Sequence, residues 1–171
     1  MTTELTPEIF TADYTGSPGE RTFFLQSKGD VVTTYLIEKG QAQVLAERLR
    51  ELLLLIDEGD TVTSAEPQRD PAFGLDAPIE PEWRVGTIGL SYDDEQDTIA
   101  VSMSPVSEEA PEIETADDFE VRIHLRRDQV RIFVLHTLAV VAEGRPLCRL
   151  CGLPMDPDGH ICPAGNGHRL G

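Results

Sequence analysis

The three cysteines of this 171-residue chain all lie near its C-terminus, beside two of its four histidines. Cys148 and Cys151 are separated by two residues, and Cys162 follows after a turn rich in Pro, Asp and Gly. Thiolate and imidazole groups at such spacing are typical ligands of a tetrahedral zinc ion. His160 and His168 are the candidates for the fourth ligand. We favour His160, because on an extended segment its side chain and that of Cys162, two residues later, point to the same face.

The predicted zinc is structural. Four protein ligands leave no coordination position open for water or substrate. Zinc binding contributes about 10–16 kcal/mol in zinc-finger peptides, enough to fold a short segment that has almost no core of its own. A zinc deaminase would also need a glutamate beside the ligands, and residues 148–171 contain none. The alternative is a reduced, metal-free cluster of thiols.

No catalytic motif is recognisable elsewhere in the sequence, which has no Gly-rich phosphate loop, no Gly-x-Ser-x-Gly elbow and no His-Glu-x-x-His. His124 falls on a predicted strand and His136 inside a predicted apolar helix, and we interpret both as hydrogen-bonded core residues. An enzyme would need a dispersed active site between the two halves of the chain. Arg84, Arg122 and His124 are the candidates to line it.

The net charge of −17 limits the possible partners. Phosphate backbones are repelled by a strongly acidic protein, so nucleic-acid binding is not expected in general. Solubility explains the acidic composition, and the alternative is an acidic surface that meets a basic partner. A nucleic-acid-linked regulator remains a further alternative, through the one concentration of basic residues: Arg122, Arg126, Arg127, Arg131, Arg145 and Arg149.

The sequence indicates a cytoplasmic protein. It has no apolar run of the roughly 18 residues needed to cross a bilayer, and its first residues lack the basic and apolar regions of a signal peptide. Cysteines clustered at one end favour metal binding over a disulfide framework.

The elements that would position these residues form two similar halves, 8–59 and 82–143. Each half predicts three strands followed by a helix, and acidic, proline-containing loops cover 60–81 and 105–118. In the first helix the apolar residues at helical spacing are Val44, Leu45, Leu49, Leu52, Leu55 and Ile56. The second helix is apolar nearly all round, through Val130, Ile132, Phe133, Val134, Leu135, Leu138, Val140 and Val141.

The fold class we predict is therefore α+β. Two βββα-like units, related by a possible internal repeat, would share one antiparallel sheet with both helices packed on it. This domain would cover residues 1–143, and a small zinc-ribbon-like module would cover 144–171.

Five segments carry a resemblance to other proteins. They are Thr-Gly-Ser-Pro-Gly-Glu-Arg-Thr-Phe-Phe-Leu-Gln at 15–26, Glu-Lys-Gly-Gln at 38–41, Trp-Arg-Val-Gly-Thr at 83–87, Gly-Arg-Pro-Leu-Cys-Arg-Leu-Cys-Gly at 144–152 and Asp-Pro-Asp-Gly-His-Ile-Cys-Pro at 156–163. In these the chain resembles an uncharacterised actinobacterial family, known as a domain of unknown function. The resemblance implies an actinobacterial, cytosolic setting and brings no established activity.

The leading hypothesis from the sequence is a protein-interaction module. It combines an acidic α+β body with a structural zinc module that docks a protein partner. The closed metal site, the missing catalytic motif and the apolar second helix support it.

Overall fold

The structure is a computed structural model that describes residues 2–17, 19–56, 66–107, 118–143, 160–161 and 169–170. The chain forms two compact units, Met1–Val140 and Val141–Gly171. Of the second unit beyond the end of the last helix, the structure describes the backbone of one short antiparallel pair, β8 (His160–Ile161) with β9 (Arg169–Leu170).

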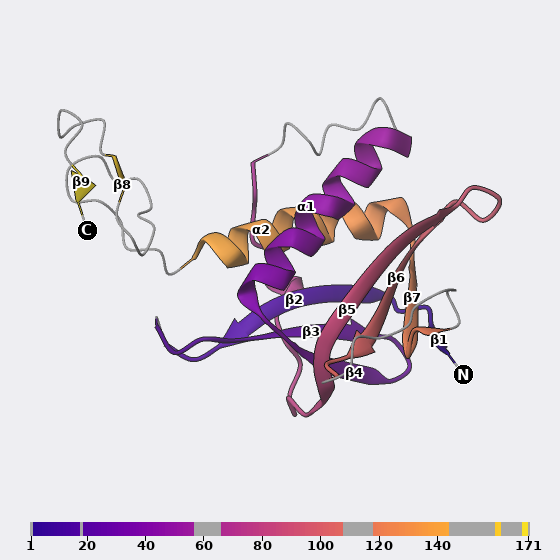
Figure 1. Ribbon diagram of the computed structural model, residues 1–171, viewed down its shortest axis with the longest axis horizontal. Coiled ribbons are helices and arrows are strands. Elements are labelled where there is room, and N and C mark those ends of the chain that lie inside the picture. Colours follow the sequence, from indigo (N-terminus) through magenta and orange to yellow (C-terminus); the bar gives the residue numbers. More distant parts are fainter. Residues whose placement is uncertain are drawn as a thin grey trace. The chain divides into compact units, whose positions relative to one another are not determined.

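The first unit contains a seven-stranded sheet and two helices (Figure 1). The strand order is β1-β7-β6-β5-β4-β3-β2. The strands are β1 (Thr3–Leu5), β2 (Ile9–Thr15), β3 (Thr22–Lys28), β4 (Val32–Ile37), β5 (Pro81–Asp93), β6 (Thr98–Pro105) and β7 (Val121–Leu125). The helices are α1 (Lys39–Ile56) and α2 (Arg127–Ala142), and a 3₁₀ turn, η1, spans Pro71–Phe73.

The predicted α+β class is confirmed, with one sheet and two helices, and each predicted half contributes three consecutive strands. The sheet is mixed, so the prediction that it is antiparallel was wrong at two places. β4 pairs with β5 in parallel, and so does β1 with β7. A parallel pair needs a long crossover connection, and the residues between β4 and β5, which include α1 and η1, supply it for the first pair.

Both helices begin with the same local device. The side-chain oxygen of Gln41 accepts the backbone N–H of Glu38 at 2.9 Å, and that of Gln129 accepts the N–H of Arg126 at 2.8 Å. A glutamine at the third helical position in this way satisfies an N–H that the helix leaves unpaired. The amide nitrogen of each glutamine also donates to the backbone of the other half of the chain.

Gln41 donates to the carbonyls of Val85 and Gly86 in β5, at 3.1 and 3.3 Å. Gln129 donates to the carbonyls of Pro7 and Glu8, just before β2, at 2.8 and 2.9 Å. Each helix start is therefore tied to the first strand of the opposite half.

The core lies between the apolar side of the sheet and the helices. Phe10 of β2 stacks on Phe133 of α2 with ring centroids 4.8 Å apart. The same side of β2–β4 and the matching side of β6 and β7 are buried: Phe10, Ala12, Leu25, Tyr35, Ile37, Ile99, Val101, Met103, Val121, Ile123 and Leu125. Burial of this much apolar surface is the main force that stabilises the unit.

The buried face of α1 differs from the predicted one. Its buried residues are Ala42, Leu45, Ala46, Leu49 and Leu53. Val44 and Leu55 belong to the predicted apolar set but are 52% and 79% exposed. The short alanines let α1 lie close to the sheet, which leaves those two longer side chains outside the contact.

Candidate functional site

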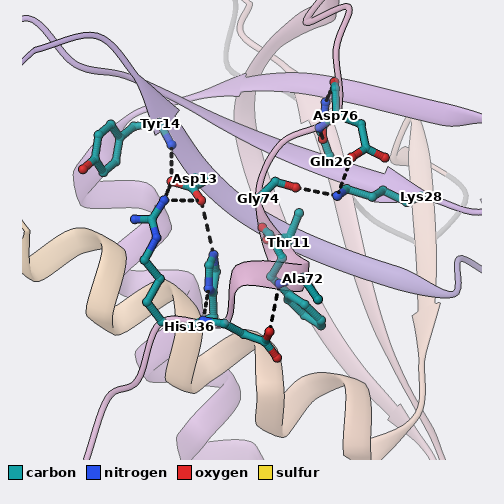
Figure 2. A network of polar contacts seen from close by, with 12 residues as sticks. Thr11, Asp13, Tyr14, Gln26, Lys28, Ala72, Gly74, Asp76 and His136 are labelled. Carbon is teal, nitrogen blue, oxygen red and sulfur yellow. Dashed lines mark hydrogen bonds and ion pairs between the residues drawn. The ribbon is translucent and has the colours of Figure 1, made fainter.

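The second face of β2–β4 is polar and yet buried. Its residues Thr11, Asp13, Gln26, Lys28 and Thr34 are all at most 8% exposed. A segment at residues 66–80, which we call the strap, supplies partners for the first four as it leads into β5, and Thr34 accepts a hydrogen bond from Gln26 (Figure 2). Buried polar groups are tolerated only when they are hydrogen-bonded. A buried polar layer of this kind is therefore a candidate functional site.

Side chains of the sheet hold the backbone of the strap. Gln26 accepts the N–H of Asp76 at 2.8 Å and donates to its carbonyl at 2.9 Å. Lys28 donates to the carbonyl of Gly74 and to the carboxylate of Asp76, the latter at 3.1 Å. Thr11 donates to the carbonyl of Phe73 at 2.6 Å. The strap is irregular and lacks the regular backbone hydrogen bonds of a strand or helix. These bonds from side chains of the sheet satisfy its backbone groups instead.

Asp13 is the most deeply buried carboxylate of this layer, at 2% exposure. Arg69 of the strap donates to both of its oxygens, at 3.0 and 2.9 Å, and the N–H of Tyr14 donates at 2.8 Å. Burial raises the pKa of Asp13, but the His136 ring that faces the carboxylate, the hydrogen bond from the Tyr14 N–H and the charge of Arg69 outweigh burial and lower the pKa overall.

His136 completes the layer from α2 and is fully buried. Its Nδ1 accepts the backbone N–H of Asp70 at 3.0 Å, so the ring proton lies on Nε2, which faces Asp13 Oδ2 at 3.5 Å. A general base needs a free nitrogen within reach of a substrate proton. In His136 that nitrogen holds the strap, so the Asp13–His136 pair is suited to positioning the strap and not to catalysis.

Two of the three residues predicted to line a dispersed active site are brought together, and the third lies apart from them. Arg122 and His124 of β7 both bind the carboxylate of Glu4 in β1, at 2.8 and 2.6 Å. Arg84 lies on β5, two strands away from β7, and pairs with Glu38 at the start of α1. The interpretation of His136 as a hydrogen-bonded core residue is confirmed, whereas His124 is half-exposed at the edge pair β1–β7.

Arginines of the predicted basic concentration also have partners within the fold. Arg127 donates to Asp97 at 2.7 Å and to the hydroxyl of Tyr92 at 3.0 Å, which fixes the β5–β6 turn to the start of α2. The hydrogen bond to Asp97 raises the pKa of Tyr92, and that same bond, followed by the bond from Arg127, lowers the pKa of Asp97. Arg126 pairs with Asp128 at 3.0 Å. Arg145 and Arg149 lie outside the described residues.

A groove with a volume of about 440 Å³ lies between α1 and β5. It is lined by Gly40, Gln41, Val44, Leu45, Arg48, Gly86, Ile88 and Leu90. Sequence analysis did not predict this groove. The surplus of apolar residues around α1 was a signal for it, because a helix with more apolar residues than its core face can hold must expose some of them.

The predicted zinc ligands Cys148, Cys151, Cys162 and His168 lie outside the described residues, and only the backbone of His160 is described, in β8. Within the described ranges, no group of three or more His, Cys, Asp or Glu side chains is arranged to hold a metal ion. The helices in these ranges include none with both the length and the apolar character needed to cross a membrane.

A family model described as "Protein of unknown function (DUF3090)" matches residues 5–162. No curated protein and no solved structure matches the chain.

Proposed function

The chain belongs to the DUF3090 family of proteins of unknown function, and from this premise we propose that it is a cytoplasmic, non-catalytic binding protein. Its C-terminal segment carries a structural zinc ion and docks a protein partner. The α+β unit is a rigid body that carries this segment and offers a second binding surface.

The observation that carries this proposal is that the polar side chains hold elements of the fold together. His136 holds the strap with one ring nitrogen and faces Asp13 with the other. Arg122 and His124 both bind Glu4. Across the described ranges, the groups that sequence analysis singled out for chemistry stabilise the fold, which is the pattern expected of a binding protein and not of an enzyme.

The extent of the family match supports zinc as part of the same function. It includes Cys148, Cys151, His160 and Cys162 and ends before His168. These four residues would supply a complete tetrahedral ligand set within the matched region. His160 is therefore our preferred fourth ligand.

Metal analysis of purified protein tests the zinc. We expect one zinc ion per chain in the wild type, and a loss of most of it in Cys148→Ser and in His160→Ala. His168→Ala is the matched control, a histidine of the same segment, and should keep its zinc. Retention of stoichiometric zinc by Cys148→Ser would refute the ligand assignment.

Affinity capture from a lysate of the native organism tests the docking role. We expect wild type and His168→Ala to retain the same protein in stoichiometric amount, and Cys148→Ser to lose it. Capture of the same protein by all three forms would mean that docking does not depend on zinc.

A further inference from the structure

β5 has one edge that is paired along most of its length and one edge that is paired only at its start. On one side it pairs with β6 from Val85 to Asp93. On the other side, β4 pairs with Pro81 and Arg84 only. Along residues 86–93, no described strand lies on this second edge, which we call the open edge of β5.

The sheet opens here for an identifiable reason. Gln41 donates hydrogen bonds to the carbonyls of Val85 and Gly86. A helix side chain therefore occupies the positions at which a continued β4 would pair with β5. A bulge falls between Val85 and Thr87, where the β5–β6 register shifts. Beyond this point α1, and not β4, accompanies β5 along its length, as Figure 1 shows.

The groove lies between α1 and this part of β5. On the strand side it presents Ile88 and Leu90, which alternate along β5 and therefore point to one face. On the helix side it presents Val44, which is 52% exposed. The one charged lining residue, Arg48, already has a carboxylate beside it, that of Glu51 at 3.2 Å. The groove thus combines an open strand edge with a row of apolar side chains.

We propose that the open edge of β5 binds an extended segment of a basic partner protein as an added strand. The backbone N–H and C=O groups of an open edge are complementary to those of another strand, and adjoining pockets select its alternate side chains. Apolar residues of the bound segment would contact Val44, Ile88 and Leu90. This inference deepens the proposed binding function by naming a surface and the kind of segment it takes.

The charge of the molecule decides between a foreign segment and a second copy. With a net charge of −17, the protein attracts a segment that carries Lys or Arg on its solvent-facing positions. A second copy carries the same −17 and is repelled. The open edge of a second copy is also flanked by that copy's own α1. Pairing of the two edges would therefore bring a second helix to a groove that already has one helix as a wall.

A fluorescein-labelled octapeptide of alternating valine and lysine is a suitable probe. We expect saturable binding by fluorescence anisotropy, with a Kd on the order of 10 µM for so short a segment. Two further peptides carry N-methyl groups on every second backbone amide, in the two possible registers. An added strand uses alternate amides, so one register should lose at least about tenfold in affinity while the other changes little. Equal effects in both registers, or no saturable binding, would overturn the proposal.

Two variants of α1 test the location. Val44→Lys places a charged side chain in the groove, and Leu55→Lys makes the same charge change at an exposed position that does not line it. Both sites are exposed, so both proteins should fold. We expect Val44→Lys to weaken binding of the octapeptide by about tenfold, an energy of about 1.4 kcal/mol, and Leu55→Lys to leave it within about twofold. An equal loss in both would reduce the binding to charge attraction and reject the groove.

Hydrogen exchange and sedimentation complete the test. Bound octapeptide should slow exchange at backbone amides within residues 87–92, and protection confined to other elements would contradict the assignment. A stable dimer whose formation protects the same amides would assign the edge to a second copy instead. Cys148→Ser should bind the octapeptide normally, so failure here and failure of zinc-dependent capture are told apart.

Discussion

His136 illustrates how a residue type associated with catalysis can serve to position a segment. Its two ring nitrogens contact two elements that are distant in sequence, the strap through Asp70 and the edge strand through Asp13. Phe73 of the strap packs against the same ring, with centroids 5.7 Å apart. Because β2 is the edge strand of the sheet, a helix beside it can reach a side chain on the polar face as well as stack on the apolar one.

Asp13→Asn should destabilise the protein. The substitution keeps the shape of the side chain but removes the charge that Arg69 and the Tyr14 N–H bind. Loss of one partner of a buried pair costs several kcal/mol, and because Arg69 is 40% exposed we expect a smaller loss of about 2–3 kcal/mol in the free energy of unfolding. Urea unfolding measures it. Glu51→Gln, in the exposed pair with Arg48, is the control and should change the free energy by less than about 0.5 kcal/mol. Similar losses in the two variants would contradict this account of Asp13.

The same carboxylate predicts a dependence on pH. The pKa of Asp13 is lowered in the folded protein from its ordinary value of 3.8. A group with a depressed folded pKa contributes stability above its unfolded pKa and loses it as the pH falls through the folded one. We therefore expect the difference in unfolding free energy between wild type and Asp13→Asn to be full at neutral pH and to shrink below about pH 4. A difference that stays constant down to pH 2 would exclude the ionised form of Asp13 as its source.

The sequence indicated correctly that His136 is a core residue, since a lone histidine in an apolar helix needs a partner more often than it serves as a base. It did not reveal Asp13 or Arg69. Asp13 lies in the first predicted half and Arg69 in the loop predicted for 60–81. Their pairing spans 56 positions of the sequence. Contacts of this length depend on the path of the strap, which local spacing does not encode.

Among the elements, the alternation of strands and the helical periodicities gave the order of two strand triplets and two helices. They could not give the direction of β5 relative to β4, which depends on the path of the long connection between the two strands. They also missed β1, because three residues are too few for an alternation pattern. The apolar surplus on α1 was real, but Val44 and Leu55 were assigned to the core when the structure exposes them.

Gly86→Ala tests the point at which the sheet opens. A Cβ atom at Gly86 would lie 2.8 Å from the carbonyl oxygen of Pro105 and 2.9 Å from the backbone of Val106, which cannot move without distorting β6. We expect a loss of about 1–3 kcal/mol in the free energy of unfolding. Gly40→Ala, in the first turn of α1, meets nothing within 4 Å. This control should be neutral or stabilise by up to about 1 kcal/mol. Thermal unfolding of both variants decides, and a neutral Gly86→Ala would mean that the bulge tolerates a side chain.

For the molecule as a whole, the proposed zinc and the α+β unit should be independent in stability. The chain divides after Val140, near the end of α2, and among the described residues every buried hydrophobic side chain except Val141 lies on the N-terminal side of that point. We expect a chelator to remove the zinc and to increase hydrogen exchange within residues 144–171, because metal binding supplies the folding energy of so small a module. The melting temperature of the α+β unit should stay unchanged in calorimetry. A large drop on chelation would show that the two units stabilise each other.

The pairing of β1 with β7 has a consequence for how the protein is made. β1 finds its partner β7 only after the strands between them and α1 have been synthesised, and residues 7 and 8 wait for Gln129 of α2. The polar face of β2 and β3 likewise lacks its partners until the strap and His136 have been synthesised. In a nascent chain that ends after α1, Asp13 and Lys28 on this polar face would therefore lack the partners that the strap and α2 supply. We expect the native sheet to form only after β7 and α2 have been synthesised, with chaperones covering the apolar strands until then.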